Sequence, residues 1–241
     1  MTEWYEHWFG EAYLDLYSHR DERDAGRIVS LLASHGAVRA GKRVLDLACG
    51  AGRHAAALAD LGAAVVGCDL SLALLRAAQR RGASQAALVR GDMRALAFAD
   101  GAFDTVVNLF TSFGYFDRDE QHAAVMVEVA RVLRPGGAFA LDYLNAVAVR
   151  SHLVPHDRTE AGGRTVVQRR RITGRGRFVV KTITVEGEGR EFMERVRLFE
   201  RAELEALVTA AGLAVQVVLG DYDGAPHSPA SPRCLLIAWR A

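Results

Sequence analysis

The stretch VLDLACGAGRHAAALA, residues 44–59, constrains this chain more than any other part of it. It begins with an apolar run, ends with an alanine-rich run, and has two glycines and little side-chain bulk in between. Glycine adopts positive φ angles readily and lets another group approach the backbone closely. We interpret the missing bulk as space for a ligand at a point where a strand turns into a helix.

Short apolar runs and helical segments alternate through the first 143 residues. A helix is predicted over 21–34, closed by Gly36, and helices are predicted for most of the segments between the strands. The strands are predicted at 43–48, 63–68, 86–90, 103–109 and 138–143. This alternation is typical of an α/β protein, in which helices cover both faces of a doubly wound, mostly parallel sheet.

The clearest helical pattern covers 117–133. Asp117 and Glu120 have the spacing of an N-terminal capping residue and its reciprocal partner. The sequence RPGG at 134–137 is expected to end this helix and turn the chain.

The character of the sequence changes at Arg164. The runs RTVVQRRRI, RFVVKTITVE and REFMERVRLF are rich in β-formers and are separated by glycine turns, which predicts a three-stranded antiparallel insert. A helix over 201–211, the strand LAVQVVLG, a long loop and the strand CLLIAW follow. We therefore expect one domain from 1–150 and 200–241, with a β insert at 151–199.

The turn after the first predicted strand, DLACGAG at 46–52, lies where an open α/β sheet binds its ligand. The N–H groups at the start of the next helix face that ligand. Asp69 ends the second predicted strand, 17 residues after Gly52, where a carboxylate can accept both hydroxyls of a ribose. The alternative is a solvated aspartate at a strand end.

The same turn argues against a dinucleotide, which needs the spacing G-x-G-x-x-G. Position 48 is alanine, and Arg53 stands where the third glycine would be. Asp46 adds a carboxylate that repels a phosphate and attracts an ammonium group. The turn therefore favours a ligand that carries an ammonium group.

Composition places the chain among ordinary globular proteins, with 241 residues, 50% of them hydrophobic, and a net charge of +1. This charge gives no reason to expect nucleic acid as a partner. No run is long enough to cross a membrane, and the acidic N-terminal residues are unlike a signal peptide, so we expect a cytoplasmic protein. Cys49, Cys68 and Cys234 form no C-x-x-C pair, so they are expected to be small buried residues, and no metal site is predicted.

The motif VLDLACGAG resembles the first motif of the class I S-adenosylmethionine-dependent methyltransferases. Asp69, GDM at 91–93 and LRPGG at 133–137 stand where that family has its later motifs. The resemblance covers roughly residues 13–143 and the last two strands, and it departs from the family at Ala48, where glycine is more frequent. It implies a seven-stranded sheet of order 3-2-1-4-5-7-6 with an antiparallel last strand.

The resemblance also implies S-adenosyl-L-methionine as cofactor. Asp46 and Gly50 would border its methionine part, Asp69 would bind the ribose, and Asp92 with the backbone of Met93 would hold the adenine. The implied cofactor-binding residues are Tyr13, Asp46, Ala48, Gly50, Gly52, Asp69, Leu70, Asp92, Met93 and Asn108.

The sequence NLFTSFGYF at 108–116, the aromatic N-terminal segment and the β insert resemble the glycine and sarcosine methyltransferases and the aminosugar N-methyltransferases. In those enzymes an N-terminal tyrosine closes over the cofactor, and an insert roofs the substrate. Tyr13 is the best match to that tyrosine and Tyr17 the second, while an amphipathic docking helix is the alternative. Arg27 is a candidate for the cofactor carboxylate, or else an ordinary surface residue.

Methyl transfer from a sulfonium needs mainly an in-line arrangement of nucleophile, methyl and sulfur, so no catalytic dyad is required. A general base is needed only if the acceptor arrives protonated. The candidates for a base are Tyr115, Tyr222, Asp223 and His227. The loop that holds the last three can equally be a rigid turn.

Nucleic acid is disfavoured as a substrate. Methylation of base amines in this class goes with a Pro-Pro motif after the fourth strand, where this chain has Leu109 and Phe110. Methylation at carbon 5 of cytosine needs a Pro-Cys nucleophile, whereas Cys234 follows Arg233. The insert is rich in basic residues, namely Arg164, Arg169, Arg170, Arg171, Arg175, Arg177 and Lys181. They fit an acidic small-molecule acceptor better than an oligonucleotide, and they also fit a solvated sheet face balanced by nearby glutamates.

We therefore predict a methyltransferase that moves a methyl group from S-adenosyl-L-methionine to a nitrogen or oxygen of a small molecule. One alternative is a nicotinamide-dependent oxidoreductase on a similar sheet. Another is a methyltransferase-like cofactor binder that acts on RNA or protein. The sequence predicts no oligomeric state.

Overall fold

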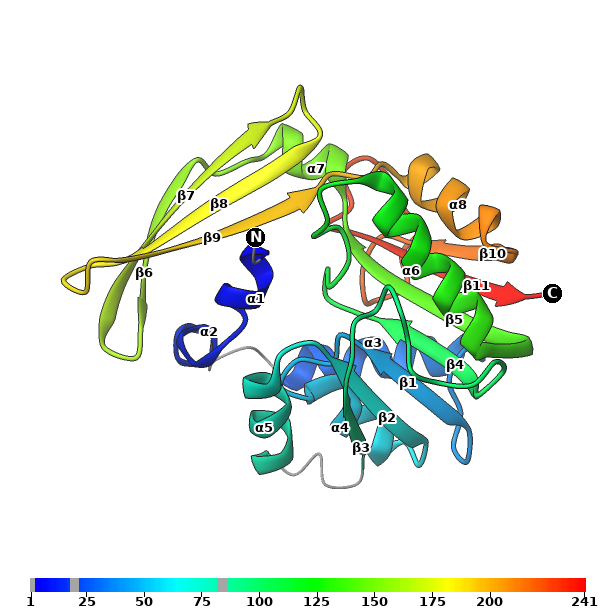
Figure 1. Ribbon diagram of the computed structural model, residues 1–241. Coiled ribbons are helices and arrows are strands. Elements are labelled where there is room, and N and C mark those ends of the chain that lie inside the picture. Colours follow the sequence, from blue (N-terminus) through cyan, green and yellow to red (C-terminus); the bar gives the residue numbers. More distant parts are fainter. Residues whose placement is uncertain (1–2, 18–21, 82–85) are drawn as a thin grey trace.

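The computed structural model describes residues 3–17, 22–81 and 86–241, and its main sheet has seven strands in the order β10-β11-β5-β4-β1-β2-β3 (Figure 1). The strands are β1 (Arg43–Leu47), β2 (Ala64–Asp69), β3 (Ala87–Arg90), β4 (Phe103–Asn108), β5 (Leu133–Leu144), β10 (Leu213–Leu219) and β11 (Arg233–Arg240). Only β11 pairs antiparallel with its neighbours, while the other pairs in this sheet are parallel. The predicted strand order and the antiparallel last strand are confirmed.

Helices cover the sheet on both faces. They are α3 (Glu22–Ser34), α4 (Arg53–Asp60), α5 (Leu72–Arg80), α6 (Asp119–Val132) and α8 (Arg201–Ala210), whereas the short helix α7 (Ala146–Ser151) follows β5 and leads to the small sheet. Asp21, the predicted first residue of the α3 helix, lies outside the described residues. On one face Ile28 of α3 and Leu58 of α4 pack with Val44 and Val107. No helix in the described part of the chain has the length and apolar character that a membrane crossing requires.

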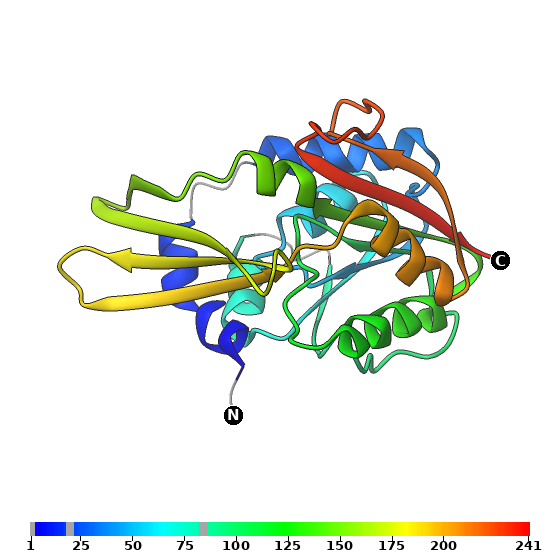
Figure 2. The same ribbon diagram turned by 90° about the horizontal axis from the view of Figure 1, so that it is seen from above.

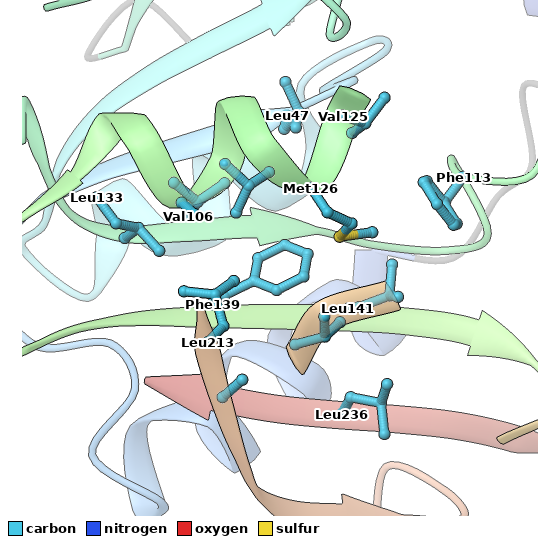
Figure 3. Packing of buried hydrophobic residues seen from close by; sticks show 14 of the residues in the cluster. Leu47, Val106, Phe113, Val125, Met126, Leu133, Phe139, Leu141, Leu213 and Leu236 are labelled. Atoms are coloured by element: carbon cyan, nitrogen blue, oxygen red, sulfur yellow. The ribbon is translucent and has the colours of Figure 1, made fainter. Parts of the chain in front are cut away.

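The other face of the sheet forms the largest apolar cluster, between α6, α8 and the central strands (Figure 3). Val125 and Met126 of α6 lie over Val106, Phe139 and Leu141, and each of these side chains is at most 1% exposed. Burying one such side chain contributes about 1.5–3 kcal/mol. The carboxyl ends of β4 and β5 therefore rest on a close-packed base.

A second, smaller sheet follows β5 and projects away from the main sheet (Figure 2). It has four antiparallel strands, β6 (His156–Ala161), β7 (Arg164–Thr173), β8 (Phe178–Val185) and β9 (Arg190–Arg197). The predicted insert had three strands. The additional strand β6 has the sequence HDRTEA and buries only Ala161, so it carries no apolar alternation that would mark it as a strand.

Two short helices, α1 (Trp4–Trp8) and α2 (Glu11–Leu16), lie between the small sheet and α5 (Figure 1). On one side the indole of Trp8 donates to Glu194 at 2.7 Å. On the other side the Ser71 hydroxyl, at the start of α5, donates to the Phe9 carbonyl at 2.5 Å. The N-terminal segment thus links the small sheet to the main one.

Two local predictions near α6 were wrong. The helix begins at Asp119, and it is the Gln121 side chain that accepts from the Arg118 backbone N–H, at 3.2 Å. Asp117 instead pairs with Arg195 of the small sheet. The helix does end at Val132, next to RPGG as predicted, but RPGG forms no separate turn and belongs to β5, which follows α6 directly.

His122 of α6 is fully buried, and neither ring nitrogen has a hydrogen-bond partner among the described residues. The rings of Phe113, Phe116 and Phe199 surround it, with centroids 4.9–5.2 Å away. Burial lowers the pKa of His122 to about 4. Between pH 4 and the ordinary histidine value near 6.5, the unfolded chain therefore binds more protons than the folded one.

We predict that His122 makes the free energy of unfolding fall as the pH falls from about 6.5 to 4, by on the order of 3 kcal/mol. Above about pH 6.5 His122 is neutral in both the folded and the unfolded chain, so it no longer makes the free energy of unfolding depend on pH. Urea unfolding at a series of pH values measures it, and His122→Leu should flatten the slope. The same change at the exposed His152 is the control. An unchanged slope in His122→Leu would contradict the prediction.

Candidate functional site

A cavity of about 610 Å³ opens at the carboxyl ends of β1, β2 and β3 and is roofed by α1 and α2. Its lining includes seven of the residues that the sequence assigned to a cofactor: Tyr13, Ala48, Gly50, Asp69, Leu70, Asp92 and Met93. They come from four separate segments of the chain. The fold therefore brings most of the predicted residues to one place.

The glycine-rich turn has an unusual backbone. Ala48, Gly50 and Gly52 all have positive φ angles, of 58°, 56° and 79°. A side chain in this region costs about 1–2 kcal/mol, which Ala48 bears and the glycines avoid. The turn is fixed by Asp69, whose two carboxylate oxygens accept from the backbone N–H groups of Gly50 and Ser71, both at 2.8 Å.

Three of the predicted residues do not line the cavity. Gly52 caps the start of α4, behind the turn. Asn108 is 2% exposed, and its side-chain amide donates to the Leu47 carbonyl at 3.0 Å, so it ties the end of β4 to β1. Asp46 is 1% exposed and lies under the turn. These three residues support the cavity wall from behind.

Asp46 has a buried carboxyl group that the described residues leave partly unsatisfied. Its Oδ2 atom has no hydrogen-bond partner among them. Burial, and then repulsion from the Asp69 carboxylate, raise the pKa of Asp46 to about 7. A cationic group near the turn would favour the charged form of this carboxyl.

Asp92 and Met93 lie at the other end of the cavity, after β3. The Arg94 side chain and backbone N–H donate to both Asp92 oxygens, at 2.6–3.1 Å. Burial alone would raise the pKa of Asp92, but the hydrogen bonds from Arg94 outweigh it and lower that pKa. Asp92 is therefore a fixed anion in the wall.

A second cavity, of about 500 Å³, lies between the main sheet and the small sheet. It shares Phe9, Tyr13, Phe110 and Tyr115 with the first cavity, so these four rings stand where the two cavities meet. The remainder of its wall is formed by the strands of the small sheet, the segment around α7, and Thr111, Leu144 and Arg233, with aliphatic side chains and several ion pairs.

The cations that line the second cavity are paired. Lys181 lies 2.5 Å from Glu194, and Arg170 lies 3.0 Å from Asp157. Arg233 contacts Asp142 at 2.8 Å. Of the basic residues that the sequence singled out in the insert, Arg170 and Lys181 line this cavity, whereas Arg169 and Arg171 are exposed.

The candidate bases are scattered. Tyr115 borders both cavities, but Tyr222 and His227 line neither of them. The Tyr222 hydroxyl instead donates to Asp142 at 2.7 Å. Asp223 is exposed and pairs with Arg27 at 2.7 Å, so the structure does not bring Arg27 to either cavity. Tyr17 accepts from Lys181 at 3.0 Å, on the small sheet.

The turn after β4 forms the wall between the cavities, and it is strained. Phe110 and Thr111 have φ angles of 58° and 60°, a region that bulky and β-branched residues rarely adopt. The buried carboxylate of Asp142 accepts from the Phe110 N–H at 2.8 Å, and its carbonyl accepts from the Thr111 N–H at 2.9 Å. Arg233 donates to the Thr111 hydroxyl at 3.0 Å. These bonds offset the strain, which costs on the order of 1–3 kcal/mol for each residue.

Sequence reasoning missed Phe9, Asp142 and Arg233 as residues of this site. Asp142 did carry a signal, because an acid inside the apolar run AFALDYL is buried on either face of a central strand and needs a partner. Phe9 and Arg233 gave no such signal, since their positions depend on how distant segments pack.

Among the residues that the structure describes, no group of three or more His, Cys, Asp and Glu side chains is placed to bind a metal ion. Cys49, Cys68 and Cys234 are buried free thiols, which confirms their predicted role as small core residues.

Comparison with known proteins places this site in a family. A family model described as a methyltransferase domain matches residues 44–137. A cypemycin N-terminal methyltransferase from a Streptomyces species is 32% identical over 249 residues, which span 95% of each chain. The chain belongs to the class I S-adenosylmethionine-dependent methyltransferases. This decides against the nicotinamide-dependent alternative.

Two further proteins resemble this methyltransferase. The dTDP-3-amino-3,4,6-trideoxy-alpha-D-glucopyranose N,N-dimethyltransferase of Streptomyces venezuelae is 32% identical over 189 residues, which cover 75% of this chain and 79% of that protein. The S-adenosylmethionine-bound structure of CalS10, an amino pentose methyltransferase from Micromonospora echinaspora, is 26% identical with a TM-score of 0.69 and covers 95% of each chain.

The first cavity fits the cofactor of this family. S-Adenosylmethionine carries an ammonium group, and Asp46 has a buried carboxylate oxygen without a partner beside the glycine turn. A Cβ atom on Gly50 would meet only the tip of Leu74, at 4.0 Å, so the turn leaves room for a ligand. The methyltransferase therefore uses S-adenosyl-L-methionine, which supplies an electrophilic methyl group when it is bound.

The strained wall yields a prediction for stability. Asp142→Asn removes the anionic partner of the largely buried Arg233, and breaking a buried pair in this way costs about 3–5 kcal/mol. We expect a loss of about 3 kcal/mol in the free energy of unfolding, measured with urea. Asp117→Asn breaks an ion pair whose carboxylate is 59% exposed and should cost less than about 1 kcal/mol. Equal losses in the two variants would contradict the account.

Proposed function

We propose that this methyltransferase transfers the methyl group of S-adenosyl-L-methionine to an amine nitrogen of a small acceptor that binds in the second cavity. The relatives that cover most of the chain support a nitrogen acceptor, because both are named for methylation at nitrogen. One acts at a peptide N-terminus by name, and the other on an aminosugar nucleotide. What these named acceptors share is an amine.

This proposal rests on the observation that the two cavities meet. Phe9, Tyr13, Phe110 and Tyr115 line both cavities, so a methyl group at the end of the first cavity faces an acceptor in the second. Holding the reactants in line can supply about 7–11 kcal/mol of the barrier reduction. Aromatic faces also attract cations, which suits a sulfonium donor and a methylated ammonium product.

In this proposal different residues of the first cavity bind different parts of the cofactor. Asp69, whose oxygens already fix the turn, keeps lone pairs for the ribose hydroxyls. Asp92 and the Met93 backbone hold the adenine, with Leu70 against its face. Asp46 acts from beneath the turn on the ammonium group, while Gly52 and Asn108 support the wall. Tyr13 closes the cavity from α2.

A general base is not needed for an amine that arrives with a free lone pair. Tyr222 is unsuited to that role, because burial, and then the charge of Asp142, raise the pKa of its hydroxyl and keep it protonated. His227 lies outside the cavities. We assign to Tyr115, at the junction, the task of placing the acceptor nitrogen.

The small sheet is proposed as the lid of the acceptor cavity, with residues 151–199 as the insert and the remainder of the chain as the cofactor-binding domain. The prediction of an acidic acceptor stays open. Each cation that lines the acceptor cavity has a carboxylate partner within 3.0 Å, so the cavity wall is nearly balanced in charge. This balance favours an acceptor without a strong negative charge near the transferred methyl.

An acceptor panel tests the proposal. The purified enzyme is incubated with S-adenosylmethionine and either an aminosugar nucleotide or a tripeptide with a free N-terminus, and products are identified by mass spectrometry. Each amine is paired with an analogue that has a hydroxyl in its place. We expect gain of a methyl group in at least one amine and in none of the hydroxyl analogues. Methylation of the hydroxyl analogues alone would contradict the proposal.

Tyr115→Phe tests whether Tyr115 positions the acceptor or acts as a general base. Its kcat is measured with the acceptor that the panel identifies. A positioning ring should lose less than about tenfold in kcat when only its hydroxyl is removed, whereas a general base should lose about a hundredfold or more. Ser34→Ala, which removes an exposed hydroxyl of α3 outside both cavities, is the control. A loss of a hundredfold or more in Tyr115→Phe would reassign Tyr115 as the base.

A further inference from the structure

Tyr5 of α1 has a buried hydroxyl that the described residues do not satisfy. The side chain is 7% exposed, and its oxygen has no hydrogen-bond partner among them. The ring is fixed by edge-on contacts with Trp4 and Phe116, at centroid distances of 5.7 and 5.9 Å. A buried hydroxyl without a partner is unfavourable, so its presence indicates a group that the described residues do not supply.

The position of Tyr5 shows which part of the site that group belongs to. Tyr5 lines the first cavity and not the second. The residues that line both are Phe9, Tyr13, Phe110 and Tyr115, and these mark the end where the methyl group is transferred. Tyr5 therefore belongs to the part of the cofactor cavity that lies away from the acceptor.

The neighbours of Tyr5 show more closely which end of the cavity its hydroxyl lies at. Arg94 stacks over the ring of Phe116 at 4.7 Å, and the same guanidinium is bonded to Asp92. Tyr5, Phe116, Arg94 and Asp92 thus form one packed set around the segment after β3. Arg94 bonds to Asp92 and stacks on Phe116, but it does not bond to the Tyr5 hydroxyl, which stays unpartnered within this set.

We propose that the Tyr5 hydroxyl hydrogen-bonds the adenine base of the cofactor, so that α1 forms part of the nucleoside site. A phenolic hydroxyl can donate and accept, and the edge of adenine offers an amine donor and ring-nitrogen acceptors. The inference rests on the proposed placement of the adenine next to Asp92 and Met93. It does not depend on which acceptor the enzyme methylates.

Tyr5→Phe tests the inference, because it removes the hydroxyl and keeps the ring. Titration calorimetry with S-adenosylhomocysteine should show an affinity about tenfold lower than that of the wild type, the effect of one hydrogen bond. The ligand-free variant should melt at the same temperature as the wild type or higher, since it no longer buries an unsatisfied hydroxyl. A merely structural tyrosine would instead lower the melting temperature.

Tyr17→Phe is the matched control. Tyr17 lies on the same N-terminal segment, but its hydroxyl is bonded to Lys181 and it does not line the first cavity. Its removal should leave the affinity for S-adenosylhomocysteine within about twofold of the wild type, well below the effect of one hydrogen bond.

A second probe, 5′-methylthioadenosine, keeps the nucleoside and lacks the amino-acid part. Tyr5→Phe should weaken its binding by the same factor as that of S-adenosylhomocysteine. Unchanged affinity for both ligands, or a loss with S-adenosylhomocysteine alone, would overturn the assignment to the adenine. Both experiments measure ligand binding and need no acceptor. They therefore test the role of Tyr5 even if no acceptor in the panel is methylated.

Discussion

One buried carboxylate, Asp142, holds together the part of the structure on which the reaction depends. It belongs to β5, and it bonds the turn after β4, the first residue of β11 and a tyrosine in the loop between β10 and β11. The turn that it holds carries Phe110 and Thr111, both in a strained backbone conformation. The boundary between the two cavities is therefore set before any ligand binds, as preorganised catalysis requires.

The features that could be predicted from the sequence are local ones. The turn at 46–52 and Asp69 lie at the ends of adjacent parallel strands, so recognising the strands was enough to place them together. Asp92 and Met93, which follow β3, were assigned instead from the resemblance to a known family. The sheet order followed from the resemblance to a known family, and the alternation of strands and helices supported it.

The features that could not be predicted depend on distant parts of the chain. Tyr222 was a candidate base because its loop is polar, yet its partner Asp142 is 80 positions away. The acceptor cavity combines Phe9 and Tyr13 of the N-terminal segment with the turn after β4 and with β8 and β9, and no spacing in the sequence indicates such a combination. Tyr5 was one aromatic among many, and only its burial without a partner distinguishes it.

A crystal structure of the enzyme with S-adenosylhomocysteine tests the central claim most directly. The account predicts that the ligand fills the first cavity, with its ribose hydroxyls on Asp69 and its adenine beside Asp92 and Met93. Its sulfur should face the rings of Phe110 and Tyr115, toward the second cavity. A ligand bound in the opposite orientation, with the sulfur away from these rings, would contradict the account.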